Sequence, residues 1–570
     1  MDFTSIDITE RVFLFFETNK NYDFLIINKK LENITGIINF FKEENEVKQL
    51  YNRIESHCLE LMERQEEYGD YQTNENLSLS ICHRLKDKNI DPQIIIEPTC
   101  GKGNFILSSL RVFNNIEKIF AIEIQEHYLW TLKFRLIDFF IENPSLNRPQ
   151  IYISNISVFD YDFSQIKNKI KDEKLLILGN PPWVTNSALS ILNSTNLPRK
   201  YNIKRTKGIE AITGKSNFDI GEYIILNLLD LFSIYYGHFA FLIKNSVIKN
   251  IIYDQKINNY QIGKIEKYSI DSMKEFGASV DSSLFLCEMH NSPDYFANEG
   301  NFYDFKITNT LGWVDGKFAS NITKYKKYNK SDGISPFEWR QGMKHDCAKV
   351  MEFEKNNGIF VNSLGETFEL EDDLVYGLLK SSDLKNDIVN NVRKYTIVTQ
   401  KYVGQDIMPV LDNLPKTKEY LINHKEFFLK RKSRIYNGKS IFSIFGIGDY
   451  SFKRYKVAIS GLYKQTKFSL VYPIEKEIML DDTCYFIGFN NREDALITQY
   501  LLNMGETQEF INSLIFFDSK RIITKELLMR IDLREIVKKV NYIDIKDIVS
   551  LENWEKYIFS YFSNTEYSLF

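Results

Sequence analysis

Short apolar runs alternate with longer amphipathic stretches between residues 92 and 295. Six of these runs have the pattern of buried strands: QIIIEPTC, KIFAIEI, QIYISNI, LLILGNPP, GHFAFLIK and SSLFLCEM. Such alternation is typical of an α/β domain whose mostly parallel sheet carries helices on both faces. We therefore predict an α/β domain over residues 66–295.

The segments on either side of this domain have different patterns. Residues 1–65 mix periodic apolar positions with many charges, which favours amphipathic helices. Beyond residue 295 the alternation stops, and residues 296–570 are rich in Lys, Tyr, Phe and Asn. We predict a helical N-terminal segment and a separate α+β domain in the C-terminal half.

No segment has the pattern of a signal peptide or a membrane span. The first residues, MDFTSIDITERVFLFF, lack a basic region, a continuous apolar run and a small-residue cleavage site. The most apolar stretch, YIILNLLDLFSIYYGHFAFLI, is interrupted by Asn227, Asp230 and His238. It therefore fits a helix, a turn and a strand better than a span. We expect a cytoplasmic protein with no membrane partner.

Composition and charge bear on the number of domains, the state of the cysteines and the distribution of positive charge along the chain. The chain has 570 residues, 44% of them hydrophobic, which is enough for two or three domains. Its six cysteines are scattered and never form a C-x-x-C pair, so we expect reduced thiols and no metal. The formal charge is −4, yet residues 421–470 hold eleven Lys or Arg against only Glu426 and Asp449. That excess defines a basic region in the C-terminal half.

The end of the first predicted strand, IIIEPTCGKGNF, favours a nucleoside ligand. Gly101 and Gly103 permit a tight turn, and the helix that follows directs its N-terminal amides at the same place. Glu123 ends the next strand, 22 positions after Gly101, where it can accept hydrogen bonds from a ribose diol. The dinucleotide pattern G-x-G-x-x-G and the phosphate-loop pattern G-x-x-x-x-G-K-[ST] are both absent. A plain strand-to-helix turn and a solvated strand end are the alternatives.

Several motifs follow one another in an order known from one enzyme family. EPTCGKG resembles motif I of S-adenosylmethionine-dependent methyltransferases, YGDYQTNENLSLSIC resembles motif X, YISNISVFDYD resembles motif III, and GNPPW resembles the catalytic motif IV. The ordered set resembles the gamma class of N6-adenine DNA methyltransferases of type II restriction-modification systems. The resemblance is strong over residues 65–290.

The resemblance implies a fold, a cofactor and a reaction. We expect a Rossmann-like methyltransferase domain that uses S-adenosyl-L-methionine to methylate the N6 amine of a flipped-out adenine in double-stranded DNA. The C-terminal domain then recognises the DNA target, and a cognate restriction endonuclease acts separately. The residues assigned to the cofactor are Thr73, Glu97, Pro98, Cys100, Gly101, Gly103, Glu123, Ile124, Asn155, Ile156 and Asn180. Asn155 stands where Asp is commoner, and its amide oxygen can still accept a hydrogen bond from the cofactor's adenine amine.

The corner after the fourth strand carries the chemistry that the resemblance implies. An exocyclic adenine amine is a poor nucleophile because its lone pair is delocalised into the ring. Asn180 offers its side-chain carbonyl and Pro181 its backbone carbonyl to the amine, while Pro181 and Pro182 fix both directions. Trp183 offers a face on which a flipped base can stack, and Phe276 is the candidate for the opposite face. Either ring is otherwise an ordinary core residue.

The basic segments of the C-terminal half mix Lys and Arg with Tyr and Phe, a composition suited to DNA phosphates and grooves. The candidate DNA contacts are Lys215, Lys430, Arg431, Lys432, Arg434, Lys453 and Arg454. A solvated charged face is the plainer interpretation. Two further functions stay open: methylation of RNA or of a protein glutamine amide, and a non-catalytic DNA-binding subunit that retains the cofactor fold.

Overall fold

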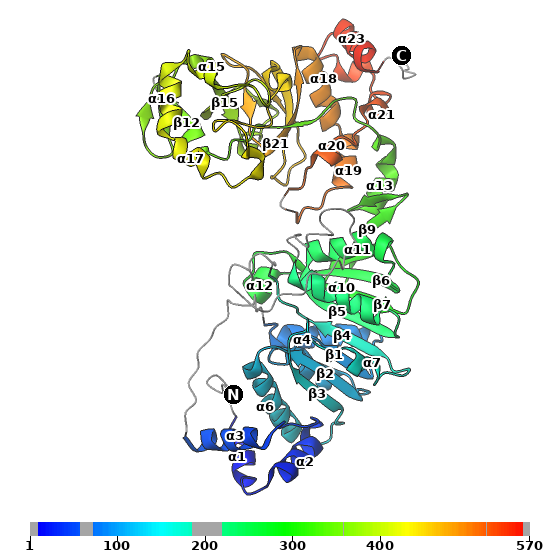
Figure 1. The fold of residues 1–570 in the computed structure, drawn as a ribbon. Helices are drawn as coiled ribbons and strands as arrows, with labels where there is room; N and C mark the ends of the chain where they lie inside the picture. The colour runs from blue at the N-terminus through cyan, green and yellow to red at the C-terminus, as the bar shows by residue number, and fades with distance from the viewer. Residues whose placement is uncertain (1–8, 57–71, 185–218, 357, 520, 563–570) are drawn as a thin grey trace. The chain divides into compact units, whose positions relative to one another are not determined.

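The computed structural model describes residues 9–56, 72–184, 219–356, 358–519 and 521–562. The chain divides into two compact units, Met1–Phe318 and Ala319–Phe570 (Figure 1). Within the described residues no helix is both long and apolar enough to cross a membrane.

A large sheet forms the centre of the first unit. Its strands are ordered β10-β9-β8-β6-β7-β5-β4-β1-β2-β3. The strands from β3 to β5 are parallel, β7 runs antiparallel to β5 and β6, and β8 runs parallel to β6. Their bounds are β1 Ile94–Glu97, β2 Lys118–Glu123, β3 Gln150–Asn155, β4 Leu175–Gly179, β5 Gly237–Lys244, β6 Ile262–Ile270, β7 Ser282–Met289, β8 Phe296–Asn301, β9 Ile307–Val314 and β10 Lys317–Ala319. This confirms the predicted α/β fold.

The helices of this unit follow the strands in sequence. They are α4 Glu75–Asp87, α5 Asn104–Val112, α6 Glu126–Glu142, α7 Ser164–Lys167, α10 Ile220–Phe232, α11 Asn245–Asn258 and α12 Ser272–Phe276. The central strands β1 and β4 are buried at every position, because helices cover both faces. The carboxyl ends of β1, β2 and β4 share one edge of the sheet, since Ile95 pairs with both Ile119 and Leu176.

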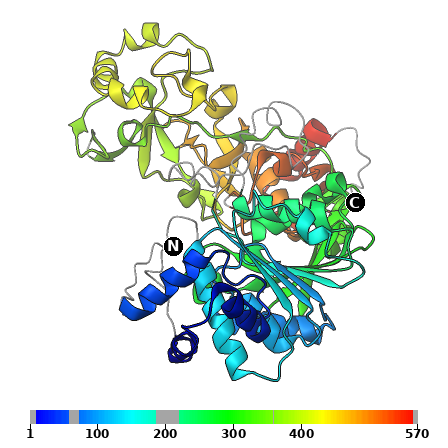
Figure 2. The same ribbon diagram turned by 60° about the horizontal axis from the view of Figure 1, so that its bottom comes forward.

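The predicted N-terminal helices are present and pack onto the sheet domain. They are α1 Glu10–Thr18, α2 Phe24–Thr35 and α3 Glu44–Ser56. Val12, Phe16, Ile27 and Leu31 are fully buried in the same core as the residues of α6. Phe16 meets Phe134 of α6 edge to face, with ring centroids 6.0 Å apart. Figure 2 shows these helices in dark blue beside the helices of the sheet domain.

The division between the units differs from the predicted boundary at residue 295. Beyond that position β8 and β9 still belong to the large sheet, because β8 pairs with β6 at Tyr268 and Gly300. The β8–β9 pair is a strand hairpin without the helix alternation from which the boundary was predicted. The compact unit therefore ends at residue 318.

The second unit has the predicted α+β character, with two sheets ordered β11-β21-β18-β19-β16 and β14-β13-β12-β17-β15-β20. The strands are β11 Arg340–Gln341, β12 Glu352–Asn356, β13 Ile359–Asn362, β14 Thr367–Phe368, β15 Val375–Leu379, β16 Ile388–Val389, β17 Lys394–Ile397, β18 Tyr455–Ser460, β19 Ser469–Val471, β20 Met479–Leu480 and β21 Cys484–Phe489. The helices are α13 Ile322–Tyr328, α14 Ala348–Met351, α15 Met408–Leu411, α16 Pro415–Asn423, α17 Lys425–Leu429, α18 Arg492–Asn503, α19 Gly505–Asn512, α20 Lys525–Leu528, α21 Leu533–Val537, α22 Tyr542–Ile545 and α23 Leu551–Phe562.

Candidate active site

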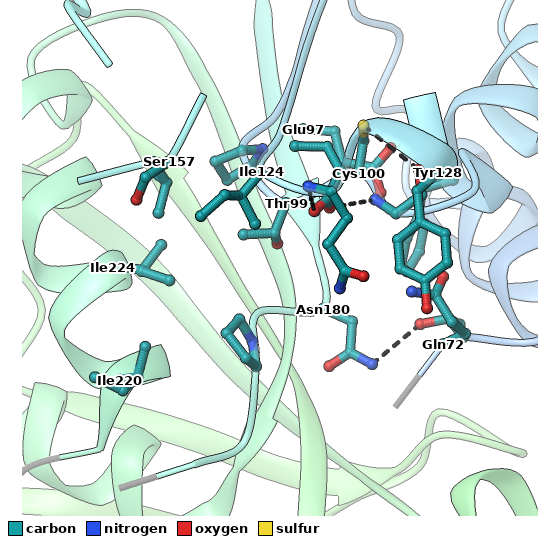
Figure 3. Close-up of a pocket in the computed structure, with 18 of the residues that line it drawn as sticks. Gln72, Glu97, Thr99, Cys100, Ile124, Tyr128, Ser157, Asn180, Ile220 and Ile224 are labelled. Atoms are coloured by element: carbon teal, nitrogen blue, oxygen red, sulfur yellow. Dashed lines mark hydrogen bonds between the residues drawn. The ribbon is translucent and has the colours of Figure 1, made fainter. Parts of the chain in front are cut away.

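A pocket lies at the carboxyl ends of β1, β2 and β4 and opens to solvent. Figure 3 shows Gln72 and Tyr128 on one side of the pocket and Ser157, Ile220 and Ile224 on the other. The predicted residues that line it are Thr73, Glu97, Pro98, Cys100, Gly101, Glu123, Ile124, Asn180 and Pro182.

The Gly-rich turn brings backbone close to this pocket. Gly101 has φ +51°, and a Cβ there would lie 2.5 Å from Oε1 of Gln72. Its N–H donates to Glu123 Oε2 at 3.0 Å. Gly103 has φ +79° and immediately precedes α5, but a Cβ there would lie 2.2 Å from Leu132 on α6. Gly103 thus permits close helix packing and does not line the pocket, which differs from its predicted contact with the cofactor.

Two carboxylates face each other across the turn. Glu123 accepts hydrogen bonds from the N–H groups of Gly101 at 3.0 Å and Gln125 at 2.9 Å. Glu97 is 2% exposed, and its Oε2 has no hydrogen-bond partner among the described residues. Burial raises the pKa of Glu97 well above its ordinary value, and the neighbouring Glu123 carboxylate raises it further. The Oγ1 of Thr99 in the same wall is also buried without a partner in the described structure.

The Asn-Pro-Pro corner begins where β4 ends. Gly179 has φ +156°, a value that favours glycine, and Asn180 follows it into the pocket wall. The Nδ2 of Asn180 donates to Thr73 Oγ1 at 3.2 Å, which fixes the plane of the carboxamide. Pro182 also lines the pocket, whereas the ring of Pro181 lies toward α10, with Cγ 3.4 Å from the position of a Cβ on Gly221.

Lys244, which the sequence analysis did not single out, contacts the last residue of the GNPPW corner. Lys244, the last residue of β5, donates from Nζ to the carbonyl oxygen of Trp183 at 2.9 Å and to Asp219 Oδ2 at 2.5 Å. Asp219 caps α10 by accepting from Gly221 N at 3.0 Å, and Ile220 N donates to the carbonyl of Val184 at 2.9 Å. The sequence feature that could have identified Lys244 is its place at the carboxyl end of β5, the strand that pairs with β4.

Trp183 and Phe276 are brought together, but against each other. Their ring centroids are 5.0 Å apart with an interplanar angle of 68°, an edge-to-face contact. Trp183 is 7% exposed and donates from Nε1 to the carbonyl of Leu242 at 3.4 Å. No base fits between rings that already touch, so stacking on both predicted faces requires the rings to separate.

The two motif III residues assigned to the cofactor, Asn155 and Ile156, lie outside the pocket lining. Asn155 is exposed, and its Nδ2 donates to the backbone carbonyls of Glu123 at 3.1 Å and Ile124 at 3.0 Å. Ile156 is 37% exposed. Asn155 therefore supports the loop after β2. On this side the pocket is lined by Ser157, Val158 and Phe159, which follow Asn155 in the sequence. The lining residues that the sequence analysis did not name are Gln72, Thr99, Asn104, Phe105, Gln125, Tyr128, Ser157, Val158, Phe159, Val184, Ile220 and Ile224.

The predicted DNA contacts of the second unit differ among themselves. Lys430, Lys432, Arg434 and Arg454 are exposed, and Lys453 is half-buried. Arg431 is different, and the structure corrects the prediction for it. Its guanidinium donates to four backbone carbonyls, at Ile441 (2.6 Å), Ser443 (2.7 Å), Phe428 (3.1 Å) and His345 (3.4 Å), so its donors are engaged inside the protein. The remaining predicted contact, Lys215, lies outside the described residues.

The described part of the chain holds no group of three or more His, Cys, Asp or Glu side chains that could bind a metal ion. Cys82, Cys100, Cys287, Cys347 and Cys484 are buried free thiols. Burial raises the pKa of Cys100 well above its ordinary value, so this thiol in the pocket wall is not a ready nucleophile.

Comparison with known proteins identifies the family. No protein-family model matches the chain. The type II methyltransferase M.NspV of Nostoc sp. is 38% identical over 480 residues, which cover 83% of this chain and 98% of that protein. The chain belongs to the type II methyltransferases. A second type II methyltransferase, M.BanIII of Aneurinibacillus aneurinilyticus, is 29% identical over 161 residues, covering 25% of this chain and 27% of that protein.

Solved structures of two restriction-modification enzymes are similar at low identity. The type IIL restriction-modification enzyme MmeI, solved in complex with DNA, is 14% identical with a TM-score of 0.46, covering 89% of this chain and 67% of that chain. The M protein of the type I restriction enzyme EcoKI is 10% identical with a TM-score of 0.27, covering 52% of this chain and 60% of that chain.

Proposed function

We propose that this type II methyltransferase transfers a methyl group from S-adenosyl-L-methionine to the N6 amine of adenine in double-stranded DNA. One observation carries the proposal: Asn180 of the Asn-Pro-Pro corner lines the same pocket as Glu123 and the Gly101 turn. A group that can accept from an amine thus shares a site with groups suited to a nucleoside. A cognate restriction endonuclease acting separately is part of the proposal.

The pocket residues fit S-adenosylmethionine. Glu123 lines the pocket with a carboxylate, the kind of group that accepts hydrogen bonds from a ribose diol, and Ile124 and Tyr128 offer apolar surface for a nucleobase. Glu97 is a buried carboxylate with an unpartnered oxygen, and an ammonium group beside it would favour its ionised form. When bound, the cofactor supplies an electrophilic methyl group on its sulfonium.

The corner prepares the nucleophile. Asn180 donates from Nδ2 to Thr73, so the carbonyl end of its carboxamide has a fixed direction for accepting an N–H of the adenine amine. Pro181 adds its backbone carbonyl as a second acceptor, and accepting from both N–H groups favours the tetrahedral amine. No general base is needed, because the amine becomes acidic once methylated and its proton can leave to solvent.

Access of the base involves Trp183 and Phe276. An amine inside a duplex cannot reach the pocket, so the adenine must leave the stack. The aromatic pair lies next to the corner, and separation of the two rings would open a face for the extrahelical base. Aromatic stacking contributes about 1–3 kcal/mol per base, enough to offset part of the lost stacking in the duplex.

The experiment that tests this function identifies the methylated nucleoside. The full-length protein is incubated with tritiated S-adenosylmethionine and unmethylated bacteriophage DNA, and the DNA is digested to nucleosides. Label in N6-methyladenine is expected, with Asn180→Ala as the inactive control. Label in a cytosine derivative, or in RNA or a glutamine-containing protein offered instead of DNA, contradicts the proposal. No transfer by a folded, cofactor-binding protein supports the non-catalytic alternative.

A further inference from the structure

Exposed cations without ion-pair partners gather on one short segment of the second unit. Lys430, Lys432 and Arg434 are exposed, and within the described structure no carboxylate lies in ion-pair distance of any of them. Nearby lysines behave differently: on α16, Lys416 lies 2.6 Å from Glu369 and Lys418 lies 2.6 Å from Asp412. The segment 430–434 therefore presents uncompensated positive charge, although the whole chain carries a formal charge of −4.

Arg431 gives this segment a fixed path. Beside its hydrogen bonds to four backbone carbonyls, its guanidinium lies over the ring of Tyr436 at 3.5 Å. Two of those carbonyls belong to Ile441 and Ser443, so the segment is fastened to residues 441–444. These contacts of Arg431 order the loop before a ligand binds, so less conformational entropy is lost on binding.

A second loop is fastened to the same residues. Thr399 Oγ1 donates to the carbonyl of Phe442 at 2.9 Å, and Gln400 Oε1 accepts from Ile444 N at 3.2 Å. The Nε2 of Gln400 donates to the carbonyl of Tyr402 at 3.0 Å, which shapes the turn that follows. Residues 399–405 and 430–434 are thus neighbouring loops on one anchor, the segment 441–444.

The tip of the second loop exposes apolar side chains. Tyr402 is 59% exposed and Val403 is 48% exposed. Gly404 follows with φ +92° and no atom within 4 Å of an ideal Cβ, so the turn projects into open space. An aromatic and a branched apolar side chain at the tip of an ordered loop, on the same anchor as unpaired cations, match a partner that has both phosphates and apolar base surfaces.

We propose that residues 399–405 and 430–434 form one surface that contacts duplex DNA. Lys430, Lys432 and Arg434 bind phosphates, whereas Tyr402 and Val403 contact bases in a groove. Arg431 is a positioning residue that orders the loop. The inference rests on the proposed function and deepens it, because it separates the cations that set affinity from the loop tip that reads sequence.

The test compares three variants of the full-length protein. Lys430→Ala/Lys432→Ala/Arg434→Ala removes the cations, Tyr402→Ser/Val403→Ser removes the tip, and Lys416→Ala/Lys418→Ala is a matched control whose lysines are paired with carboxylates. Calorimetry with S-adenosylmethionine verifies that each variant keeps its cofactor pocket. Fluorescence anisotropy then measures binding of a labelled mixed-sequence duplex over a range of salt concentrations, with double-stranded RNA of the same length as competitor.

The two DNA variants should fail in different ways. In the cation variant, the slope of log affinity against log salt should fall by up to about 2.7, since each phosphate contact contributes about 0.9. The control should keep the wild-type slope. The tip variant should also keep the slope, but its preference for the methylated site, mapped first by single-molecule sequencing, should drop roughly 5- to 150-fold over mixed-sequence DNA.

The outcomes separate this inference from the proposed function. If the wild-type protein neither binds nor methylates DNA, the proposed function fails. If the wild-type protein does both, an unchanged salt slope in the cation variant or unchanged site preference in the tip variant overturns the inference alone. A preference for double-stranded RNA over DNA also overturns it, because side chains cannot read the deep major groove of A-form RNA.

Discussion

The side-chain ammonium of Lys244 lies 2.9 Å from the backbone carbonyl oxygen of Trp183 and links the Asn-Pro-Pro corner to β5. The same ammonium contacts Asp219 at the start of α10, so one cation links three elements. Both side chains are mostly buried, at 14% and 13% exposed. The position of Trp183 thus depends on a residue from another strand.

Lys244→Met is expected to lower kcat about 10- to 100-fold, because a small displacement of positioned groups costs that much in rate. The cofactor affinity should change little, since Lys244 does not line the pocket. Lys244→Arg keeps a cationic donor and should restore part of the rate. Lys171→Met, an exposed lysine of the same unit, is the control. Equal kcat in wild type and Lys244→Met would contradict the positioning role.

Glu123→Ala should weaken binding of S-adenosylmethionine by about 1–3 kcal/mol in calorimetry, the range for a lost polar partner. The carboxylate also accepts from the N–H groups of Gly101 and Gln125, so the turn itself should loosen. Thermal unfolding of the variant checks that the domain stays folded. Unchanged affinity in a folded variant would remove Glu123 from the site.

Asn180→Ala should act on the chemical step. Loss of a preorganised hydrogen-bonding group at a reacting centre typically costs about 10²–10³ in rate. Binding of cofactor and DNA should persist, because the Gly101 turn and the basic segment are untouched. Single-turnover transfer of tritiated methyl groups measures the step directly. Wild-type transfer by a variant that binds both ligands would contradict the mechanism.

Trp183→Ala should act on the flipped base. With 2-aminopurine at the target position, fluorescence should rise when wild-type protein or Asn180→Ala binds the duplex. If the base stacks on Trp183 as proposed, removal of this ring should change that response and weaken affinity for an extrahelical adenine. An identical fluorescence response in Trp183→Ala would exclude stacking on this ring.

We expect Lys456 to make the free energy of unfolding of the second unit depend on pH. Burial lowers the pKa of this lysine to about 7, and its Nζ donates to the carbonyl of Lys453 at 2.7 Å. Between pH 7 and the ordinary lysine pKa, the unfolded chain therefore binds more protons than the folded one, and the free energy of unfolding rises with pH. Lys456→Met should flatten this rise in urea unfolding measured from pH 6 to pH 9. A variant with the same pH dependence as wild type would contradict the assignment.

Local patterns predicted part of the pocket wall. Glu97 and Glu123 end β1 and β2, Gly101 lies in the turn after β1, and Asn180 directly follows β4. Because the carboxyl ends of parallel strands share one sheet edge, these residues line one pocket. The contrast is Asn155, which also ends a strand. Its side-chain amide binds the backbone at the end of β2, because Nδ2 donates to the carbonyls of Glu123 and Ile124. The sequence pattern does not show these hydrogen bonds.

The sequence by itself determined the strand-helix alternation, the Gly-rich turn and the Asn-Pro-Pro corner, because each depends on residues within one element or its immediate neighbours. Tertiary structure alone decided which charged side chains face inward. Arg431 and Lys432 are adjacent in a basic run, yet Arg431 donates to four backbone carbonyls while Lys432 is exposed. Lys244 likewise meets Trp183 only after two strands have paired. The charge pattern of the sequence shows where cations occur along the chain. It does not show their hydrogen-bond partners, because those partners come from segments that are distant in the sequence.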